Sequence, residues 1–407
     1  MKDKAIKKLI DRETKRQNET INLIASENYV SRDVREALGS VFTNKYAEGY
    51  PRARYYGGNV FVDELEDLVR ARALKLFDVK DSVWSLNVQP YSGSPANVAV
   101  YHALLAPGEK IMGMRLDMGG HLTHGHKVSV TGKLWQQVSY GVDGKTERLN
   151  YDEIVGIAKK ERPKLIVAGY SAYSRIIDFK KFREIADTVN AIFMVDMSHF
   201  AGLVAGRTYN SPFPYAHVVT TTTHKTLRGP RAAIIFSRKE FAQKIDKAIF
   251  PGLQGGPHMN AIAAVGVALH EASSAAFSIY AKQIIKNSQT LARELQKHGW
   301  RIVSGGTDTH LFLVDVQARD ISGSVASDRL ENVGIVVNKN AIPFDVRGPM
   351  DPSGIRIGAA AVTTRSMKEK EMKIIADCIS KSLLGKSGQS DIKQRVRKLC
   401  VAFPLFS

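Results

Sequence analysis

The sequence predicts an α/β protein, with a mostly parallel central sheet and a smaller C-terminal α/β domain. Short apolar runs alternate with helical periods from about residue 62 onward, which is typical of parallel strands covered by helices on both faces. A long helical stretch over about 260–298 then precedes a second, shorter alternating section. The length of 407 residues also exceeds one ordinary domain. We therefore expect an N-terminal arm over 1–40, a large domain over 41–275 and a small domain over 276–407.

The expected elements follow from hydrophobic periodicity. An apolar stripe from Val62 to Leu76 predicts a first helix, and Pro95 in the first turn of 95–105 predicts a second. A further helix is expected over 179–189. Strands are expected at 111–114, 165–168, 192–195, 218–222, 233–236, 311–314 and 335–337. Helical stripes over 372–383 and 392–399 complete the chain.

Composition excludes several classes of protein. With 44% hydrophobic and 24% charged residues, the chain is neither fibrous nor disordered. The longest apolar run, 261–269, is shorter than the roughly 18 residues that cross a bilayer, so no membrane span is expected. Residues 1–16 mix basic and acidic side chains without the apolar core of a secretory signal, which favours the cytoplasm. Cys378 and Cys400 fall on apolar helix faces and are expected to be buried thiols.

The net charge of +18 is unusual, with 58 Lys and Arg against 40 Asp and Glu. The excess is spread thinly: residues 2–16 carry seven basic against three acidic side chains, and residues 381–398 carry six against Asp391. Such a charge favours polyanionic partners, and it leaves a nucleic-acid-binding protein as an alternative from another functional class. Zinc-finger spacing and RNA-binding motifs are missing, so a solvated basic surface is the simpler interpretation and nucleic acid is an unlikely partner.

Two polar sequences directly follow apolar strands, where open parallel sheets place their ligands. The run 192–195 is followed by Asp196 and His199, and the run 218–222 ends in Thr222, His224 and Lys225. Taken singly, the aspartate could be an ordinary helix cap and the lysine a solvated side chain.

A third segment, Ser92-Gly93-Ser94, enters the helix over 95–105 and can present backbone N–H groups to a phosphate. Neither a Walker-type loop nor a dinucleotide fingerprint is present. One ligand would use all three segments: pyridoxal phosphate has a phosphate, an aldehyde for Lys225 and a pyridine nitrogen for Asp196. His121 offers a flat ring to stack on this cofactor.

Several strings resemble the serine hydroxymethyltransferase family, which belongs to the fold-type I pyridoxal phosphate enzymes. The resemblance covers roughly residues 20–365. The matching strings are Leu23–Tyr29, Thr43–Pro51, Arg54–Gly58, Asn87–Pro90, Gly119–Gly125, Thr220–Leu227, Gly255–Pro257, Ser304–Thr307 and Gly354–Arg356.

The resemblance implies a role for each residue of the cofactor site. Lys225, beside Thr222 and His224, would form the internal aldimine, Asp196 would pair with the pyridine nitrogen, and His121 would stack on the ring. The phosphate would be held by the Ser92, Gly93 and Ser94 segment and by Gly256 from a second subunit. Ser171 and His199 would lie near the phenolic oxygen of the cofactor.

The resemblance also implies the substrate residues. Arg356, with Ser26 and His199 nearby, would bind the carboxylate of the amino acid. Glu48 would be the acid–base group between the serine hydroxyl and the folate. The aromatic residues of the same segment, Tyr46, Tyr55 and Tyr56, would complete this pocket, and the segment would serve the neighbouring subunit of a homodimer. The pterin would contact Leu116, Gly120, Leu122, Asn340 and Gly348.

The expected reaction is the reversible conversion of serine and tetrahydrofolate to glycine and 5,10-methylenetetrahydrofolate, a step of one-carbon metabolism. Ala359-Ala360-Ala361 and the segment 346–352 depart from the family pattern beside the folate positions, which leaves a modified pterin as an alternative carrier. A threonine-type aldolase or an aminotransferase is the alternative with the same cofactor. Polyglutamylated folates are polyanions, and the basic surface is expected to attract them.

Overall fold

The computed structural model describes residues 1–385 and 388–405, which form two compact units. The large unit comprises residues 28–282, and the small unit comprises residues 1–27 with the described residues from 283 onward. The arm, large domain and small domain expected from the sequence stay a prediction.

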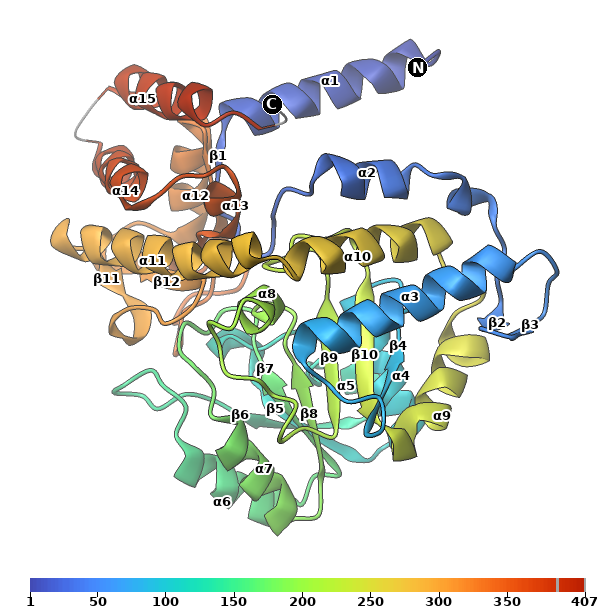
Figure 1. Ribbon diagram of the computed structural model, residues 1–407. Helices are drawn as coiled ribbons and strands as arrows, with labels where there is room; N and C mark the ends of the chain where they lie inside the picture. Colours follow the sequence, from blue (N-terminus) through green and yellow to red (C-terminus); the bar gives the residue numbers. More distant parts are fainter. Residues whose placement is uncertain (386–387, 406–407) are drawn as a thin grey trace. The chain divides into compact units, whose positions relative to one another are not determined.

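A seven-stranded sheet is the centre of the large unit (Figure 1). Its order is β4-β10-β9-β8-β7-β5-β6, and the five strands from β9 to β6 pair in parallel, while β10 is antiparallel to both of its neighbours. The mostly parallel sheet predicted from the sequence is therefore confirmed. The strands are β4 (Trp84–Asn87), β5 (Lys110–Met114), β6 (Gln136–Tyr140), β7 (Leu165–Gly169), β8 (Ile192–Asp196), β9 (Val218–Thr222) and β10 (Ala233–Arg238).

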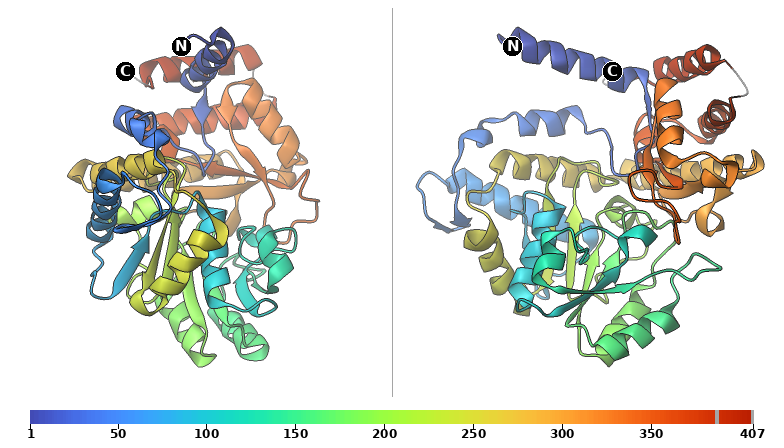
Figure 2. Two further views of the ribbon diagram at one scale, coloured as in Figure 1. Left: turned by 90° about the vertical axis from the view of Figure 1, so that its right-hand side faces the viewer. Right: turned by 180° about the vertical axis from the view of Figure 1, so that it is seen from behind.

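Helices cover both faces of this sheet (Figure 2). On one face, Leu165 and Met194 pack with apolar residues of α4 (Gly93–Leu104) and α9 (Lys239–Lys247). On the other face, Phe193 stacks on Phe182 of α7 (Phe179–Thr188) at 6.0 Å between ring centroids. The remaining elements of this unit are α2 (Arg32–Leu38), β2 (Gly49–Tyr50), β3 (Ala53–Arg54), α3 (Val60–Phe77), α5 (Val130–Leu134), α6 (Tyr151–Glu161), α8 (Ala201–Ala205) and α10 (Met259–Ala272).

The helical stretch expected over about 260–298 is confirmed, and the structure divides it into two helices, α10 and α11 (Ala275–Lys297). Ser273 and Ser274 separate them. Each serine hydroxyl donates back to a carbonyl at the end of α10, and Ser274 Oγ also accepts from the backbone N–H of Phe277 at 3.3 Å. Serine side chains that compete for backbone groups in this way end one helix and begin the next.

The small unit contains a four-stranded antiparallel sheet in the order β11-β12-β15-β14 and a short parallel pair, β1 with β13. Cys378 and Cys400 are buried thiols in its apolar core, as expected. Its strands are β1 (Ile21–Asn22), β11 (Arg301–Ile302), β12 (Leu311–Asp315), β13 (Ile335–Val336), β14 (Asn338–Asn340) and β15 (Gly354–Gly358). Its helices besides α11 are α1 (Lys4–Glu19), α12 (Gly323–Asn332), α13 (Ala360–Thr364), α14 (Glu369–Leu384) and α15 (Gln389–Ala402). Short η segments lie at Val41–Asn44, Leu116–Met118, Ala248–Leu253, Val303–Gly305 and Gln317–Arg319.

Arg365, directly after α13, binds the backbone at both ends of the small unit. Its guanidinium donates to the carbonyls of Thr20 and Asn18, at the end of α1, at 2.8 and 3.2 Å. It also donates to the carbonyls of Cys400 and Phe403, at the end of α15, at 3.0 and 2.7 Å. One buried cation therefore satisfies carbonyl groups that two helix ends would otherwise leave without a partner.

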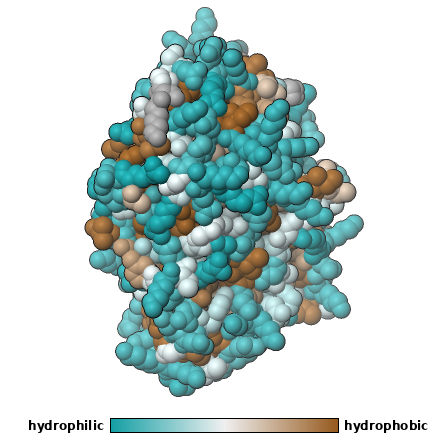
Figure 3. Space-filling model, turned by 90° about the vertical axis from the view of Figure 1, so that its left-hand side faces the viewer, coloured by the Kyte–Doolittle hydropathy of each residue, from teal (hydrophilic) through white to brown (hydrophobic). Residues whose placement is uncertain are grey.

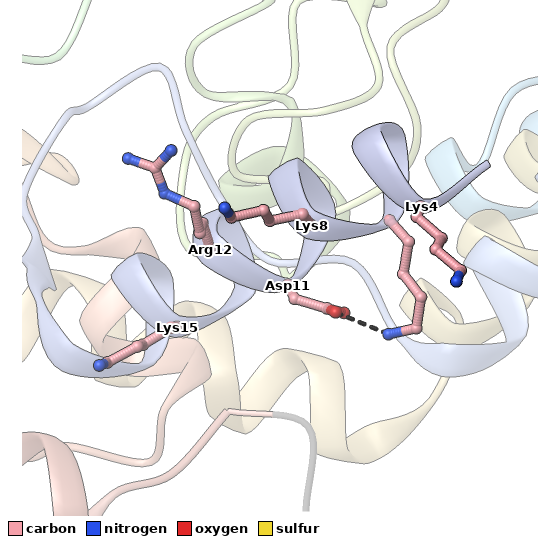
Figure 4. Close-up of a pocket in the computed structure, with 6 residues that line it drawn as sticks. Lys4, Lys8, Asp11, Arg12 and Lys15 are labelled. Carbon is pink, nitrogen blue, oxygen red and sulfur yellow. Dashed lines mark hydrogen bonds and ion pairs between the residues drawn. The ribbon is translucent and has the colours of Figure 1, made fainter.

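Charged and polar side chains cover most of the face drawn in Figure 3. The N-terminal helix α1 buries no residue and carries six Lys and Arg against three Asp and Glu. Figure 4 shows Lys4, Lys8, Arg12 and Lys15 around a shallow cavity of about 350 Å³, in which Lys7 pairs with Asp11 at 2.6 Å. Among the described residues, no single helix is both long and apolar enough to cross a membrane, and α10 with α11 meets that length and composition only as a bent pair.

Candidate active site

Asp196 is the last residue of β8 and lies at the carboxyl end of the parallel sheet. Three groups from different segments contact its carboxylate. Asn97 Nδ2, from α4, donates to Oδ2 at 2.9 Å, and His124 Nε2 lies 3.2 Å from the same oxygen. The backbone N–H of Ser198 donates to Oδ1 at 3.0 Å. These contacts leave the carboxylate with one fixed orientation.

The charge of Asp196 is stabilised despite its burial. Burial alone raises the pKa of a carboxyl group, but the hydrogen bond and charge of the neighbouring His124 hold the pKa of Asp196 well below its usual range. Asn97 is itself oriented, because its Oδ1 accepts from Thr220 Oγ1 at 2.7 Å. A buried aspartate that remains ionised is suited to pair with a protonated ring nitrogen.

Lys225 lies three residues beyond the end of β9 and is buried. Its carbonyl accepts from Asn28 Nδ2 at 2.9 Å, which fixes the backbone at this position. Burial, together with the charges of Lys225 and Arg231, lowers the pKa of the neighbouring His224 to about 3, so that this imidazole is neutral at neutral pH. Within the part of the chain that the structure describes, Thr222 Oγ1 and His224 Nδ1 are buried and make no hydrogen bond.

The first turn of α4 lies against the end of β9. Ser92 is the N-cap residue of α4, and its side chain makes no capping hydrogen bond. A Cβ atom on Gly93 would lie 2.6 Å from Thr222 Cγ2, so only glycine permits this close approach. The uncapped backbone N–H groups and the unsatisfied hydroxyl of Thr222 are therefore close together, as a phosphate site requires.

His121 is joined to the same network through Thr123. The hydroxyl of Thr123 lies 2.7 Å from His121 Nδ1 and accepts from Asn97 Nδ2 at 2.9 Å. Burial and the neighbouring His124 lower the pKa of His121 to about 4. The imidazole of His121 is therefore neutral near pH 7, and a neutral ring stacks on a positively charged pyridine ring without repulsion.

These residues fit pyridoxal phosphate. The ionised Asp196 suits the ring nitrogen, Lys225 supplies the amine, and the start of α4 with Thr222 suits the phosphate. The unsatisfied polar atoms of Thr222 and His224 are the observation that favours a bound polar group, because buried polar atoms are normally hydrogen-bonded.

Ser171 and His199 follow neighbouring strands, β7 and β8. The backbone N–H of Ser171 donates to the carbonyl of Gly119 at 2.7 Å. The carbonyl of His199 accepts from Thr226 Oγ1 at 2.9 Å, and the His199 side chain is buried. Their expected place near the phenolic oxygen of the cofactor stays a prediction.

The segment that carries Glu48 is exposed, in contrast to the cofactor residues. Tyr46, Tyr55 and Tyr56 are 54%, 75% and 49% exposed. Tyr46 OH donates to Glu48 Oε1 at 3.3 Å, and the Tyr46 and Tyr56 rings meet edge to face at 5.1 Å. A side chain at Gly256 would contact the Tyr46 ring, so Gly256 lies in the same cluster.

Arg356 lies on β15 in the small unit and is buried. Its Nε donates to Asn338 Oδ1 at 3.0 Å, and its Nη2 donates to Ser26 Oγ at 3.3 Å. Burial lowers the pKa of Arg356 to about 10, which leaves the guanidinium charged at neutral pH. The structure thus joins two residues, Ser26 and Arg356, that the sequence assigned to the amino acid carboxylate.

The expected pterin positions fall in both units. Leu116 and Leu122 are exposed and Gly120 is buried in the large unit, whereas Asn340 ends β14 and Gly348 lies in an exposed loop of the small unit. Asn340 Nδ2 donates to the carbonyl of Ala341 at 2.6 Å. Their contact with a pterin stays a prediction.

The sequence analysis missed Asn97, His124 and Asn338. Asn97 is a polar residue buried among alanine and valine on α4, and this interruption of an apolar helix face was the available signal. His124 is three residues after His121 and was passed over as part of a longer string. Asn338 pairs with Arg356 across β14 and β15, and this register is visible only in the folded sheet.

A family model described as serine hydroxymethyltransferase matches residues 1–379. The chain belongs to the serine hydroxymethyltransferase family. A serine hydroxymethyltransferase of Acidobacterium capsulatum is 54% identical over 400 residues, covering 98% of this chain and 93% of that protein. One of Koribacter versatilis is 53% identical over 407 residues, covering 99% and 95%. Members of this family are fold-type I transferases that depend on pyridoxal phosphate, so this chain is an enzyme with that cofactor.

Proposed function

We propose that this enzyme reversibly transfers the hydroxymethyl carbon of serine to tetrahydrofolate, giving glycine and 5,10-methylenetetrahydrofolate. The observation that carries the proposal is the buried, ionised Asp196 at the sheet edge that also ends in Thr222 and Lys225. The family and the names of both relatives support the same reaction.

When bound, pyridoxal phosphate supplies an aldehyde that joins to amines and a protonated pyridine ring that withdraws electrons from the Cα of the amino acid. Lys225 supplies the amine that holds the cofactor, and Asp196 keeps the proton on the ring nitrogen. Asn97 and His124 keep Asp196 oriented and charged. His121 excludes water from one face of the ring, and the start of α4 binds the phosphate through its backbone N–H groups.

Two further residues act on the substrate. Arg356 binds the carboxylate of serine through its planar guanidinium, and Ser26 and Asn338 hold that guanidinium in place. Glu48 exchanges a proton with the serine hydroxyl while the bond between Cα and Cβ breaks. Tyr55 and Tyr56 line the space around Glu48. The contacts of the pterin with Leu116, Gly120, Leu122, Asn340 and Gly348 are part of the proposal.

Serine cleavage measured with and without tetrahydrofolate tests the reaction. We expect a yellow holoenzyme whose serine turnover depends on tetrahydrofolate, with borohydride reduction and peptide mapping placing the pyridoxyl group on Lys225. Stimulation of glycine Cα proton exchange by another pterin, but not by tetrahydrofolate, would contradict the proposed carrier. Label on a different lysine would contradict the role of Lys225.

A homodimer with shared sites is a further part of the proposal. Its support is the cluster in which the exposed rings of Tyr46 and Tyr56 surround the half-buried Glu48 and Gly256, polar and aromatic groups that a second copy would cover. The cytoplasmic location expected from the sequence stays a prediction, as does preference for polyglutamylated folate.

Subunit mixing tests the shared site. In a hybrid of a Lys225→Ala chain and a Glu48→Gln chain, one site receives both altered residues and the other receives neither. Random mixing of two inactive variants should therefore restore about one quarter of the wild-type activity. No recovery after mixing, with hybrid formation shown by native mass spectrometry, would mean that each site is built from one chain.

A further inference from the structure

The hairpin formed by β2 and β3 holds Glu48 on an unusually well-fixed backbone. Glu48 directly precedes β2, and its carbonyl accepts from the backbone N–H of Tyr55 at 3.1 Å. Gly49 has φ +93°, and a Cβ there would lie 2.3 Å from the carbonyl oxygen of Ala53. Only glycine therefore allows the chain to turn directly after Glu48.

Arg54 reaches back from β3 to the peptide groups on both sides of Glu48. Its Nη1 donates to the carbonyl of Ala47 at 2.9 Å and to the carbonyl of Gly49 at 2.8 Å. The carbonyl of Gly49 also accepts from Gln89 Nε2 at 3.0 Å. The carbonyls of residues 47, 48 and 49 are thus all hydrogen-bonded, which fixes the backbone on both sides of the Glu48 side chain.

Arg54 is in turn anchored on α3. Its Nη2 donates to Glu66 Oε2 at 2.7 Å, and its Nε donates to Asp63 Oδ1 at 2.9 Å. The side chains of Arg54 and Glu66 are only 4% and 2% exposed, so this ion pair is almost fully shielded from solvent. Burial raises the pKa of Glu66, and the charge of Arg54 opposes that rise. A buried ion pair costs desolvation, so its presence here is weak evidence of a gain in stability.

We infer that Arg54 is a positioning residue that fixes the carboxyl group of Glu48 for proton transfer, with Glu66 as its anchor. The inference rests on the proposed role of Glu48. A guanidinium is required, because its planar fork reaches two carbonyls and two carboxylates at once, whereas a lysine ammonium at this position reaches only part of that set.

Arg54→Lys in the holoenzyme is the test, since it keeps the charge beside Glu66 and Asp63 and removes the fork. We expect kcat for tetrahydrofolate-dependent serine turnover to fall roughly tenfold to a hundredfold, the scale of a small misplacement of a catalytic group. Cofactor absorbance and glycine affinity should stay within about twofold of wild type, because the hydrogen bonds of Arg54 go to Ala47, Gly49, Asp63 and Glu66 rather than to the cofactor residues. Arg52→Lys is the matched control: Arg52 lies on the same hairpin, its side chain is 72% exposed, and it pairs with Asp67.

A double-mutant cycle separates positioning from general destabilisation. If Arg54 acts through Glu48, adding Arg54→Lys to Glu48→Gln should lower kcat no further, whereas a merely structural role gives multiplied losses. Multiplied losses, or an unchanged kcat in Arg54→Lys, would overturn the inference and leave the proposed function standing. Full turnover in Glu48→Gln would overturn the role of Glu48 and the inference together.

Glu66→Gln provides a second variant if Arg54→Lys does not fold. It keeps the shape of the anchor and removes its charge, so kcat should again fall while glycine affinity holds. A Glu66→Gln enzyme with wild-type kcat in the same assay would overturn the inference.

Discussion

The residues around Asp196 and the hairpin that carries Glu48 differ in how far they are buried. Asp196, Asn97 and His124 are buried, and each is held by other side chains of the same unit. Glu48 has a fixed backbone and a half-buried side chain, and the rings of Tyr46, Tyr55 and Tyr56 around it are exposed. The contacts of Asp196 therefore come from within one chain, whereas the exposed tyrosine rings beside Glu48 are open to a second surface. In the proposed function, the first region holds the cofactor and the second acts on the substrate.

Asp196→Asn should have the largest effect, because it removes charge from the enclosed region without changing its shape. A neutral amide cannot keep the cofactor ring protonated, and we expect serine turnover to fall roughly a thousandfold. Thermal unfolding of the variant should remain cooperative, which would show that the fold is intact. Near-normal turnover in a folded Asp196→Asn enzyme would refute the assigned role.

Glu48→Gln alters the exposed region alone. Loss of one acid–base group should lower tetrahydrofolate-dependent turnover by roughly a hundredfold to ten-thousandfold. Cofactor and glycine should still bind, because Glu48 contacts none of the residues that hold Asp196. Spectroscopic titration with glycine checks this separation, and a parallel loss of cofactor binding would show that the two regions are not independent.

Arg356→Ala tests whether Arg356, a buried residue of the small unit, takes part in substrate binding. If Arg356 binds the amino acid carboxylate, the substitution should weaken serine binding by about 2–5 kcal/mol, the usual loss for one partner of a buried charge pair. Equilibrium titration with serine measures the change. Arg319→Ala is a suitable control, because Arg319 is a half-buried arginine of the same unit that binds the carbonyls of His298 and Gly299. Unchanged serine affinity in Arg356→Ala would remove this residue from the site.

His121 should give the smallest effect, as a pH dependence of stability in the cofactor-free chain. Its pKa is about 4 when folded and about 6.5 when unfolded. Between these values the unfolded chain binds more protons, so the contribution of His121 is present above pH 6.5 and is lost as the pH falls toward 4. Thermal unfolding of wild type and His121→Asn across this range measures it. Parallel pH curves for the two proteins would show that His121 titrates normally.

The two regions also differ in how well the sequence predicted them. The strands that precede Asp196 and Lys225 are confirmed. Short apolar runs at regular intervals between helical segments are typical of buried parallel strands, so their positions could be predicted. The partners of Asp196 were not predicted, since Asn97 meets it across 99 positions of sequence. The break at Ser273 was missed because helical periodicity continues through it, and only the hydroxyl contacts reveal two helices. The hydrogen bonds of Arg54 to the carbonyls beside Glu48 likewise depend on the folded backbone, which hydrophobic periodicity does not reveal.

Arg365 ties the end of α1 and the end of α15 to one guanidinium. Shortening the chain past Thr20 would remove the acceptors at residues 17, 18 and 20 and leave part of this buried guanidinium without hydrogen-bond partners. Trimming past Cys400 would do the same from the other side. Both terminal helices are therefore expected to contribute to the stability of the small unit. Variants that begin after Thr20 should be prone to proteolysis throughout residues 283–385.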